Sequence, residues 1–480
     1  MNIDGLSGSL SKGKTGTREM VVPTSDPILT RSENVIQSSL LENFWLVAAD
    51  MGYGHQRAIY PLKALSRSAG IINANLSIKA TQREIRLWRN MLSTYEFMSR
   101  AGKLPLIGRT ITRVLDGMLY IPKFYPLKDR SKPTLQVKYL RGKIKQGLCK
   151  GVAKQITSPE LPLITSYFAS AISADLALHE KVYCIICDTD LSRVWAAEDA
   201  YRSRIIYFVP GTIAAQRLLS YGVADKNILI TGFPLPLSLL GKRNLDTLKY
   251  NLSRRLRNLD PSGSFYNLYK YSVDAFLSSV DFESPEADHK HKCVTITYAV
   301  DGAGAQKEIG KTLARSLSWK MEKNEVKLNL VAGTRIDVRD YFLEVKNEFA
   351  AKSNNLKVIW AGETEMYFDL FNHCLRTTDI LWTKPSELSF YCALGIPIIT
   401  TPAIGPQEKC NRRWLREIGA GFKQRDPEYA DQWIDDLLQK GSLAEAAWLG
   451  FLKGRKYGTF NILDFLERGS FNVSNNPLKR

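Results

Sequence analysis

The chain has 480 residues, of which 66 are Lys or Arg and 48 are Asp or Glu, so its formal net charge is +18. Hydrophobic residues make up 44% and charged residues 24%, close to the average of soluble globular proteins, which excludes a disordered or fibrous protein. At roughly 100 to 200 residues per domain, the length predicts two to four domains. Seven cysteines, an odd number spread over a long chain, are not typical of a disulfide framework and favour a reducing cytoplasm.

The N-terminal segment is predicted to be a disordered leader. Residues 1–39 are rich in Ser, Thr and Gly and lack the apolar core of a signal peptide. The most apolar long stretch, residues 161–178, is interrupted by polar side chains, so it falls short of the roughly 18 uninterrupted apolar residues of a membrane-spanning helix. Membrane contact is therefore expected to be peripheral.

Residues 40–232 are predicted to form a first doubly wound domain. A compact apolar run at 44–49 precedes a Gly-containing turn and then apolar residues at helical spacing from Ala58 to Leu65, which predicts a strand, a loop and a helix. Further apolar runs at 182–187, 205–209 and 228–231 are typical of a parallel sheet covered by helices.

A second domain of the same kind is predicted at 293–428. Its expected strands are 294–299, 326–332, 356–360, 380–382 and 396–400. Residues 233–292 are interpreted as a linker with a helical insertion, and residues 429–480 as final helices that return to the first domain, followed by a tail. The fold class is therefore α/β, with two Rossmann-like domains facing an interdomain cleft, where ligands of such sheets bind.

The loop after the first predicted strand, Asp50-Met51-Gly52-Tyr53-Gly54-His55, can carry a base. Gly52 and Gly54 permit a tight turn and bring His55 to a helix N-terminus that faces the cleft. The near-neutral pKa of an ordinary histidine suits removal of a proton from a hydroxyl group. A purely structural, helix-capping role for His55 is the alternative.

The equivalent loop of the second domain is Asp301-Gly302-Ala303-Gly304-Ala305-Gln306. It follows the first strand of that domain and precedes an amphipathic helix, so its small residues would let backbone N–H groups approach a phosphate. A Gly-x-Gly pattern alone is weak evidence, and an ordinary turn is the alternative.

The segment Thr383-Lys384-Pro385-Ser386-Glu387 places a hydroxyl, a cation and a carboxylate on one strand-to-helix turn. The next such turn, Gly405-Pro406-Gln407-Glu408, adds an amide and a second carboxylate. These groups could bind a phosphate and sugar hydroxyls. Alternatively, Ser386 is only a helix cap, with Glu387 in the first turn.

These motifs together resemble those of the GT-B glycosyltransferases, in particular the group of diacylglycerol glycosyltransferases, monogalactosyldiacylglycerol synthases and the peptidoglycan GlcNAc-transferase (family 28-like). That group has an early Gly-Gly-Gly-His loop, which is similar to 52–55 here. Its Thr-Lys-Pro-Gly-Gly turn, Gly-Leu-Pro and Gly-Gln-Glu are similar to 383–389, 395–397 and 405–408, in the same order. The likeness spans about residues 44–422.

The resemblance implies transfer of a sugar from a nucleotide-diphosphate sugar, UDP-linked, to a lipid or lipid-linked acceptor, with inversion and without a catalytic metal or a cofactor. It implies that His55 deprotonates the acceptor, with Asp50 as its partner or as an alternative base, and that Gly52 and Gly54 shape the acceptor loop. The implied donor-binding residues are Gly302, Gly304, Arg335, Gly362, Thr383, Lys384, Ser386, Glu387, Gln407 and Glu408. Among them Gln407 and Glu408 would hold the sugar, and Gly362 would approach the base.

The sequence departs from the family pattern at two places. Ser386 and Glu387 stand where the family has glycines, and Cys392 stands where the family has the acidic residue that binds the ribose. Glu387 could replace that acid from the preceding turn.

Residues 83–154 hold 17 basic residues against four acidic ones, a local net charge of +13. Aromatic residues are interleaved with them, which fits an anionic membrane surface or nucleic acid. No nucleic-acid-reading motif accompanies the segment, so nucleic acid is not expected. The sequence predicts a cytoplasmic protein, peripheral on the inner face of the membrane. Two alternatives remain open: a nucleotide-sugar epimerase on the same fold, and a non-catalytic scaffold or sugar-binding protein.

Overall fold

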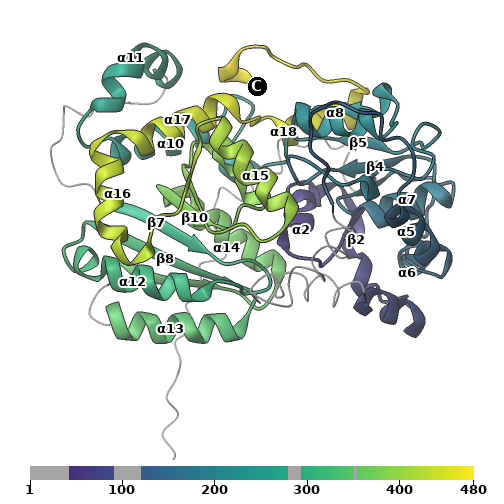
Figure 1. Cartoon of the computed structure of the whole chain (residues 1–480), viewed down its shortest axis with the longest axis horizontal. Helices are drawn as coiled ribbons and strands as arrows, with labels where there is room; N and C mark the ends of the chain where they lie inside the picture. The colour runs from purple at the N-terminus through teal and green to yellow at the C-terminus, as the bar shows by residue number, and fades with distance from the viewer. Residues whose placement is uncertain (1–42, 91–119, 279–292, 351–353) are drawn as a thin grey trace, which may run out of the picture.

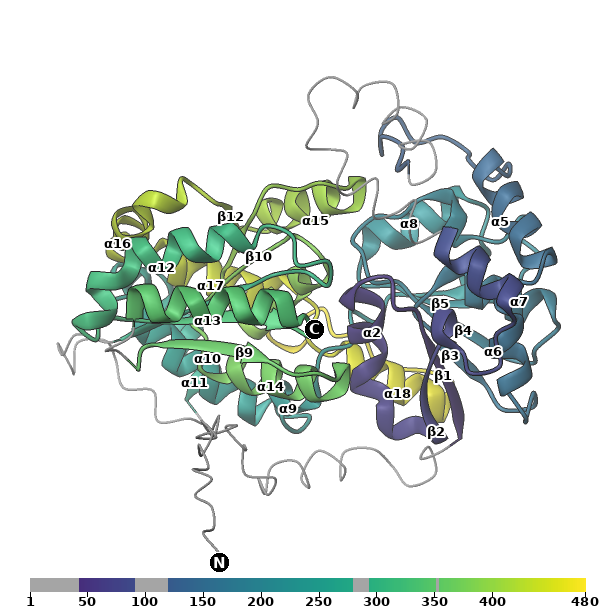
Figure 2. The same ribbon diagram turned by 90° about the horizontal axis from the view of Figure 1, so that it is seen from below.

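The computed structural model describes residues 43–90, 120–278, 293–350 and 354–480. The predicted leader at 1–39, the middle of the basic segment and the acidic stretch before residue 293 lie outside these ranges. The described residues form two lobes that lie side by side (Figure 2). Each lobe is built around one parallel six-stranded sheet.

The sheet of the first domain has the strand order β2-β1-β3-β4-β5-β6. Its strands are β1 (Phe44–Ala48), β2 (Ser66–Asn73), β3 (Leu163–Thr165), β4 (Val182–Ile185), β5 (Ile206–Phe208) and β6 (Ile228–Leu229). The helices are α2 (Tyr53–Ile59), α5 (Leu135–Lys145), α6 (Lys150–Gln155), α7 (Phe168–Leu176) and α8 (Thr212–Ser220). Every residue of β1 and β4 is buried, as expected for apolar runs in a sheet covered on both faces.

The sheet of the second domain has the order β12-β11-β10-β7-β8-β9, the strand order of the Rossmann fold. Its strands are β7 (Val294–Ala299), β8 (Val326–Gly333), β9 (Leu356–Trp360), β10 (Ile380–Thr383), β11 (Ile398–Thr400) and β12 (Gly421–Lys423). The helical elements are α12 (Lys307–Glu322), α13 (Ile336–Ala350), α14 (Thr364–Thr377), the 3₁₀ helix η7 (Glu387–Leu394), α15 (Pro406–Glu417), α16 (Ala430–Gln439) and α17 (Ser442–Lys453). In Figure 1, α12 and α13 lie side by side next to β8.

The predicted fold class is confirmed, because two parallel sheets with interleaved helices face one interdomain cavity, the GT-B arrangement. The strands at 294–299 and 356–360 have the predicted bounds. The prediction of one continuous helix through Leu65 is wrong after Ile59. There α2 ends at Ile59 and a 3₁₀ helix, η2 (Tyr60–Leu65), follows, because Pro61 at its start has no N–H to continue the α-helical pattern. None of the helices in the described ranges is long and apolar enough to cross a membrane.

The segment after the first domain forms α9 (Leu237–Leu240), α10 (Asp246–Leu259) and α11 (Ser264–Leu277). Arg255 anchors α10 to the second domain, since its buried guanidinium donates hydrogen bonds to the carbonyls of Thr378 and Leu394. The last helix, α18 (Gly458–Arg468), returns to the first domain. Phe465 on α18 packs against Phe208 on β5, with ring centroids 5.7 Å apart.

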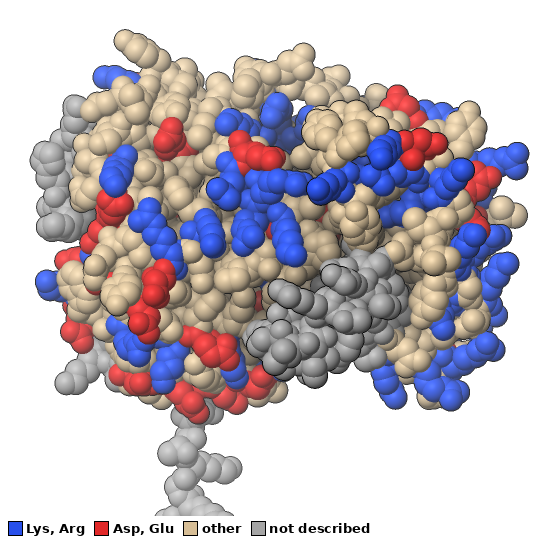
Figure 3. Space-filling view, viewed as in Figure 1, with Lys and Arg blue, Asp and Glu red and all other residues tan. Residues whose placement is uncertain are grey.

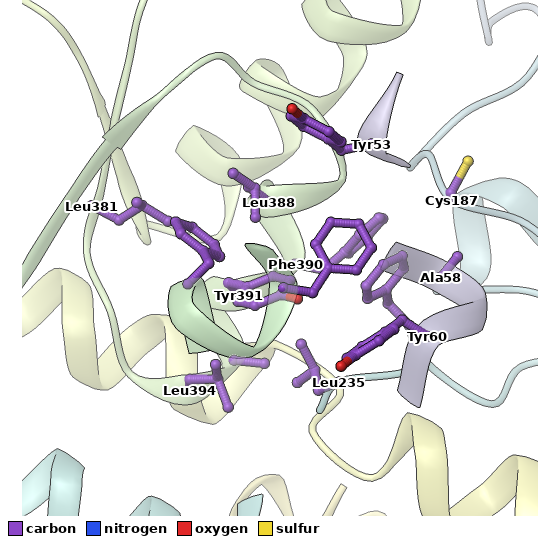
Figure 4. Close-up of a cluster of buried hydrophobic side chains, with 14 of the residues drawn as sticks. Tyr53, Ala58, Tyr60, Cys187, Leu235, Leu381, Leu388, Phe390, Tyr391 and Leu394 are labelled. Atoms are coloured by element: carbon purple, nitrogen blue, oxygen red, sulfur yellow. The ribbon is translucent and has the colours of Figure 1, made fainter. Parts of the chain in front are cut away.

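Apolar packing continues from one domain into the other. Figure 4 shows Tyr53, Ala58 and Tyr60, from α2 and the start of η2, beside Phe390 and Tyr391 of η7. These side chains belong to one buried hydrophobic cluster. The two domains are therefore joined through α2 and η7, at one wall of the cavity between them.

Candidate functional site

A cavity of about 640 Å³ lies between the domains. It is lined by loops that follow β1 in the first sheet and β7 and β10 in the second. In both sheets the strand order reverses at these strands, which is where ligands of doubly wound folds bind. Most residues singled out from the sequence line this cavity: Asp50, Gly52, Gly54, His55, Gly302, Arg335, Thr383, Lys384, Ser386, Glu387, Gln407 and Glu408.

The two ends of the cavity differ in chemistry. The first domain contributes most of the apolar and aromatic side chains, together with polar groups such as Asp50, His55, Asp188 and Asp190. The apolar and aromatic ones are Leu76, Ile121, Tyr139, Leu140, Tyr167, Phe168, Leu191, Val194 and Trp195. The second domain contributes mainly polar and charged groups, which are those of Asp301, Thr334, Arg335, Thr383, Lys384, Ser386, Gln407 and Glu408. One cavity can thus hold a ligand with an apolar part and a ligand with phosphates and hydroxyls at the same time.

His55 is held in one tautomer. Its Nδ1 lies 2.6 Å from the carbonyl oxygen of Ser166, in the loop after β3, so Nδ1 carries the proton and donates it. Burial lowers the pKa of His55 to about 4, and the Ser166 carbonyl opposes this only in part. His55 is therefore neutral at pH 7, with the lone pair on Nε2. The orienting group is this carbonyl, whereas the carboxylate of Asp50 accepts a hydrogen bond from Gln56.

Asp188, in the loop after β4, is a second group of this cavity that can take a proton. The pKa of Asp188 is raised to about 7, mainly by burial and also by the nearby carboxylates of Glu387 and Glu408, against a hydrogen bond from Asn411. A carboxyl group with a pKa near neutrality is suited to general base catalysis at pH 7. Asp188 is not part of the motifs from which the sequence predicted the site.

Asn411 on α15 fixes Asp188 from the opposite domain. Its Nδ2 donates to Asp188 Oδ1 at 2.8 Å, and its Oδ1 accepts from the backbone N–H and the hydroxyl of Thr189 at 2.9 Å each. Asn411 is fully buried, and its two bonds with Thr189 are made away from water. The amide of Asn411 thereby joins α15 to the loop after β4.

Lys384 is the cation at the centre of the polar end. Its Nζ lies 2.9 Å from Asp301 Oδ2 and 2.8 Å from Glu408 Oε1, so one ammonium group links the loops after β7, β10 and β11. Arg335 is more exposed and pairs with Asp337 at 2.9 Å. These two cations and the exposed backbone of the loop at Gly302 are the groups of the polar end that can attract an anion.

Tyr53 of the first domain contacts Thr334, which directly follows β8 in the second domain. Its hydroxyl accepts a hydrogen bond from the backbone N–H of Thr334 at 2.8 Å and lies 3.0 Å from the Thr334 hydroxyl. A Cβ at Gly333, where φ is +69°, would come within 2.3 Å of the Tyr53 hydroxyl. Glycine is therefore required at position 333 both by the left-handed backbone and by the tyrosine.

Two predicted residues lie outside the cavity lining: Gly304 and Gly362. Gly304 has φ +68° and faces Val338 and Arg335, so its role in the structure is a close loop-to-helix contact. Cys392, at the place of the family's ribose-binding acid, is fully buried in a small apolar cluster with Ile398 and Leu415. Glu387 does line the cavity, where Arg57 neutralises it at 3.0 Å.

Comparisons with known proteins give likenesses of fold at low identity. A UDP-GlcNAc 2-epimerase from Neisseria meningitidis bound to UDP-GlcNAc shares 13% identity, with a TM-score of 0.42 over 89% of this chain and 98% of that one. MurG from Acinetobacter baumannii shares 13%, with a TM-score of 0.38 over 69% and 78%. The glycosyltransferase of kitacinnamycin shares 11%, with a TM-score of 0.43 over 89% and 98%.

No family model matches the chain, and the search of curated proteins returned no match. With TM-scores below 0.5, the likenesses to solved structures carry no argument about activity.

Several groups of the site were not found from the sequence. Arg57, Tyr53 and Asn411 meet their partners only across the domain interface, and Ser166 contributes a backbone carbonyl, which carries no sequence signal. Within the described ranges, no group of three or more His, Cys, Asp or Glu residues has the geometry to hold a metal ion.

Proposed function

We propose that the protein is a glycosyltransferase that moves a sugar from a nucleotide-diphosphate sugar, UDP-linked, to a hydroxyl of a lipid or lipid-linked acceptor. The observation that carries the proposal is the single cavity with a polar end from the second domain and an apolar end from the first, and with His55 and Asp188 in its lining. A donor and an amphipathic acceptor can meet in such a cavity with a base beside the reacting hydroxyl.

The donor belongs at the polar end. Its diphosphate would lie near the Gly302 loop, Ser386 and Lys384, where backbone N–H groups and an ammonium group can stabilise the charge of the leaving group. Gln407 and Glu408 line the same end and can bind sugar hydroxyls. The proposal assigns this charge stabilisation to the protein and not to a metal ion.

In the transfer, the acceptor oxygen attacks the anomeric carbon as the bond from that carbon to the phosphate oxygen breaks. The bond electrons leave with the nucleoside diphosphate, the configuration inverts, and the acceptor proton passes to a base. His55 and Asp188 are the two candidates. The pKa of about 7 favours Asp188 over His55, whose pKa of about 4 makes it the weaker base.

The acceptor belongs at the apolar end, which opens toward exposed apolar residues of the first domain. Among these, Leu76 is 62% and Tyr139 47% exposed while both also line the cavity. Tyr125 and Leu127 are 72% and 67% exposed and stand among the basic residues 123, 128, 130 and 132. Exposed apolar side chains beside cations are typical of a surface that binds an anionic bilayer.

The distribution of charge supports the same docking surface. Figure 3 shows Lys and Arg gathered over α15 and along the side of the first domain that carries α5 and α6. Both groups can face one anionic membrane surface. We therefore extend the proposal to peripheral binding at the cytoplasmic face of a membrane, from which the lipid acceptor would enter the apolar end.

An epimerase acting on the donor sugar is the second candidate function. The observation in its favour is Asp188, because a carboxylate with a pKa near 7 can also remove a proton from a sugar carbon beside the leaving group. Such an enzyme needs no acceptor, so the apolar end of the cavity favours transfer. Product analysis distinguishes a non-catalytic scaffold, which would bind a sugar nucleotide without turnover, from both the transferase and the epimerase.

A thermal-shift screen against UDP, GDP, ADP and their common sugar conjugates tests donor binding. A ligand at about 100 times its dissociation constant adds roughly 2.7 kcal/mol of stability. We expect a selective rise in melting temperature with one nucleotide, and loss of that rise in K384M. No rise with any nucleotide would contradict the proposal.

A further inference from the structure

A second cavity of about 310 Å³ opens between the domains on the other side of the Asn411 contact. It lies between α15 and α8, which face each other across the two lobes in Figure 2. Thr189, one residue after Asp188, belongs to its wall. No step of the proposed transfer uses this cavity.

The charged side chains around this cavity are all cations. Lys453, Arg455 and Arg480 line it, and no Asp or Glu is found among its described lining residues. Within the described part of the chain, neither Lys453 nor Arg455 has an ion-pair partner, and Nε of Arg480 is buried without a hydrogen bond. Burial and the charge of Arg480 lower the pKa of Arg455, so an anion between the two arginines would relieve an unfavourable contact.

The backbone adds further donors for an anion. Helix α8 begins at Thr212, its N-cap is Gly211, and no side chain caps it. Gly211, Thr212 and Ile213 line the cavity, and a Cβ at Gly211 would meet nothing within 4 Å. The uncapped N-terminus of a nine-residue helix, which is its positive end, therefore belongs to the cavity wall.

The remaining wall is aromatic. Phe390 stacks on Phe233 with centroids 4.9 Å apart at 15°, and the ring centroid of Trp414 lies 5.3 Å from that of Phe390. All three rings line the cavity, so a ligand held by the cations would lay its remaining part against aromatic faces. A free inorganic anion would leave this wall without a contact.

We propose that this second cavity binds an organic monophosphate whose remaining part is flat and apolar. Arginine side chains match a phosphoryl group with paired N–H donors, the α8 N-terminus adds backbone donors, and Trp414 and Phe390 contact the ring. The volume is at the lower end of the range of small-molecule sites, about 300 to 1,000 Å³, which fits a single ring with one phosphate.

Phenyl phosphate is the probe that tests the site, by isothermal titration calorimetry of the full chain with inorganic phosphate and phenol as comparison ligands. We expect saturable binding of phenyl phosphate and weaker binding of either comparison ligand. K453E and R455Q should each weaken binding about tenfold or more, because each removes a charged donor. R416Q, which removes an exposed cation of α15 outside the cavity, should bind as the wild type does.

One further variant and the exposure of Lys453 keep the test decisive. W414L should reduce the preference for phenyl phosphate over inorganic phosphate while the latter still binds. Lys453 is exposed, so K453E is expected to fold even if R455Q does not. Absence of saturable binding would overturn the proposal. Binding that survives K453E and R455Q but is lost in K384M would also overturn it, because the ligand would then occupy the larger cavity.

Discussion

Arg57 on α2 and Glu387 on η7 form a buried ion pair across the domain interface, with Nε and Oε1 3.0 Å apart and both side chains less than a tenth exposed. The guanidinium also donates to the hydroxyl of Tyr367 at 2.5 Å and lies over the rings of Phe368 and Phe371. An arginine of the first domain is thus enclosed by groups of the second. The ion pair joins the two domains at the wall of the cavity. Glu387 stands at the position where the resembled family has a glycine in its Thr-Lys-Pro-Gly-Gly turn.

Replacing Arg57 by Met should destabilise the protein by about 3–5 kcal/mol, because Glu387 would remain as a buried, unpaired carboxylate. The double variant R57M/E387Q should recover part of this loss, since no charge is left uncompensated. Urea unfolding followed by tryptophan fluorescence measures both. R335M is the matched control, because Arg335 pairs with Asp337 at the surface and a surface pair contributes about 1 kcal/mol or less. Equal losses in R57M and R335M would contradict a stabilising role for the buried pair.

The pH dependence of kcat/KM separates the two candidate bases. Asp188 must be ionised to accept a proton, and its pKa is about 7, so activity is expected to fall as the pH drops below about 7. If His55 were the base, activity would persist to about pH 4, since its neutral form is lost only there. D188N should lose most activity while retaining nucleotide binding. A profile that is flat from pH 7 to pH 5 would assign the proton to His55, and H55A would then be the inactive variant.

The pH dependence of protein stability should show that His55 is neutral in the folded protein, without any measurement of activity. The pKa of His55 is lowered from 6.5 to about 4, so the unfolded chain binds a proton more readily between these values. Because of His55, the free energy of unfolding therefore decreases as the pH falls from about 6.5 to about 4. H55Q should lose less stability than the wild type over that window in urea titrations. Identical slopes for both proteins would contradict the burial of a neutral imidazole.

Lys384 should control donor affinity. K384M removes the ammonium group that faces Asp301 and Glu408, so two carboxylates would be left facing the donor phosphates. We expect the dissociation constant of the nucleotide to rise by about tenfold or more, as for loss of a charge-assisted contact. Titration calorimetry measures this, with circular dichroism as the check of folding. K409M changes an exposed lysine outside the cavity, and an equal loss in that variant would point to a general charge effect.

Membrane binding should depend on the exposed residues beside the cavity. Co-sedimentation with vesicles that contain anionic phospholipid should fall when Tyr125 and Leu127 are changed to Ser, and when Lys123 and Lys128 are changed to Glu. Each cation near an anionic surface contributes about 1 kcal/mol, and this part should weaken with added salt. Y271S/L268S changes equally exposed apolar residues of α11 and is the control. Undiminished sedimentation of the Tyr125 and Leu127 variant would contradict the proposed surface.

The alternation of apolar runs and helical patterns was sufficient to predict the fold, because half of the twelve described strands are fully buried and are largely apolar in sequence. The strands β3 and β12 were missed. The strand β3 lies inside the longer apolar stretch 161–178, which hides its bounds, and β12 has a single apolar residue between Gly421 and Lys423. The strand β2, Ser66–Asn73, was also missed, because it holds Ser, Arg and Gly in place of an apolar run. Its place at the sheet edge tolerates such residues.

The candidate site could be predicted where a residue follows a strand, as with His55, Gly302 and Ser386, because parallel strands bring their carboxyl ends to one edge. It could not be predicted where two domains meet. The contacts of Arg57 with Glu387 and of Asn411 with Asp188 depend on how the domains are placed, which no local pattern encodes. The pKa of Asp188 follows from burial at that same interface.

Product analysis shows directly whether the protein transfers a sugar to a lipid. The protein is incubated with a panel of UDP- and GDP-sugars and vesicles made from a membrane lipid extract, and the organic and aqueous phases are examined by mass spectrometry. The account predicts a lipid whose mass has increased by one sugar residue, with release of one nucleoside diphosphate for each lipid formed, and loss of both in D188N. A donor sugar that is epimerised or released without any glycosylated lipid would contradict it.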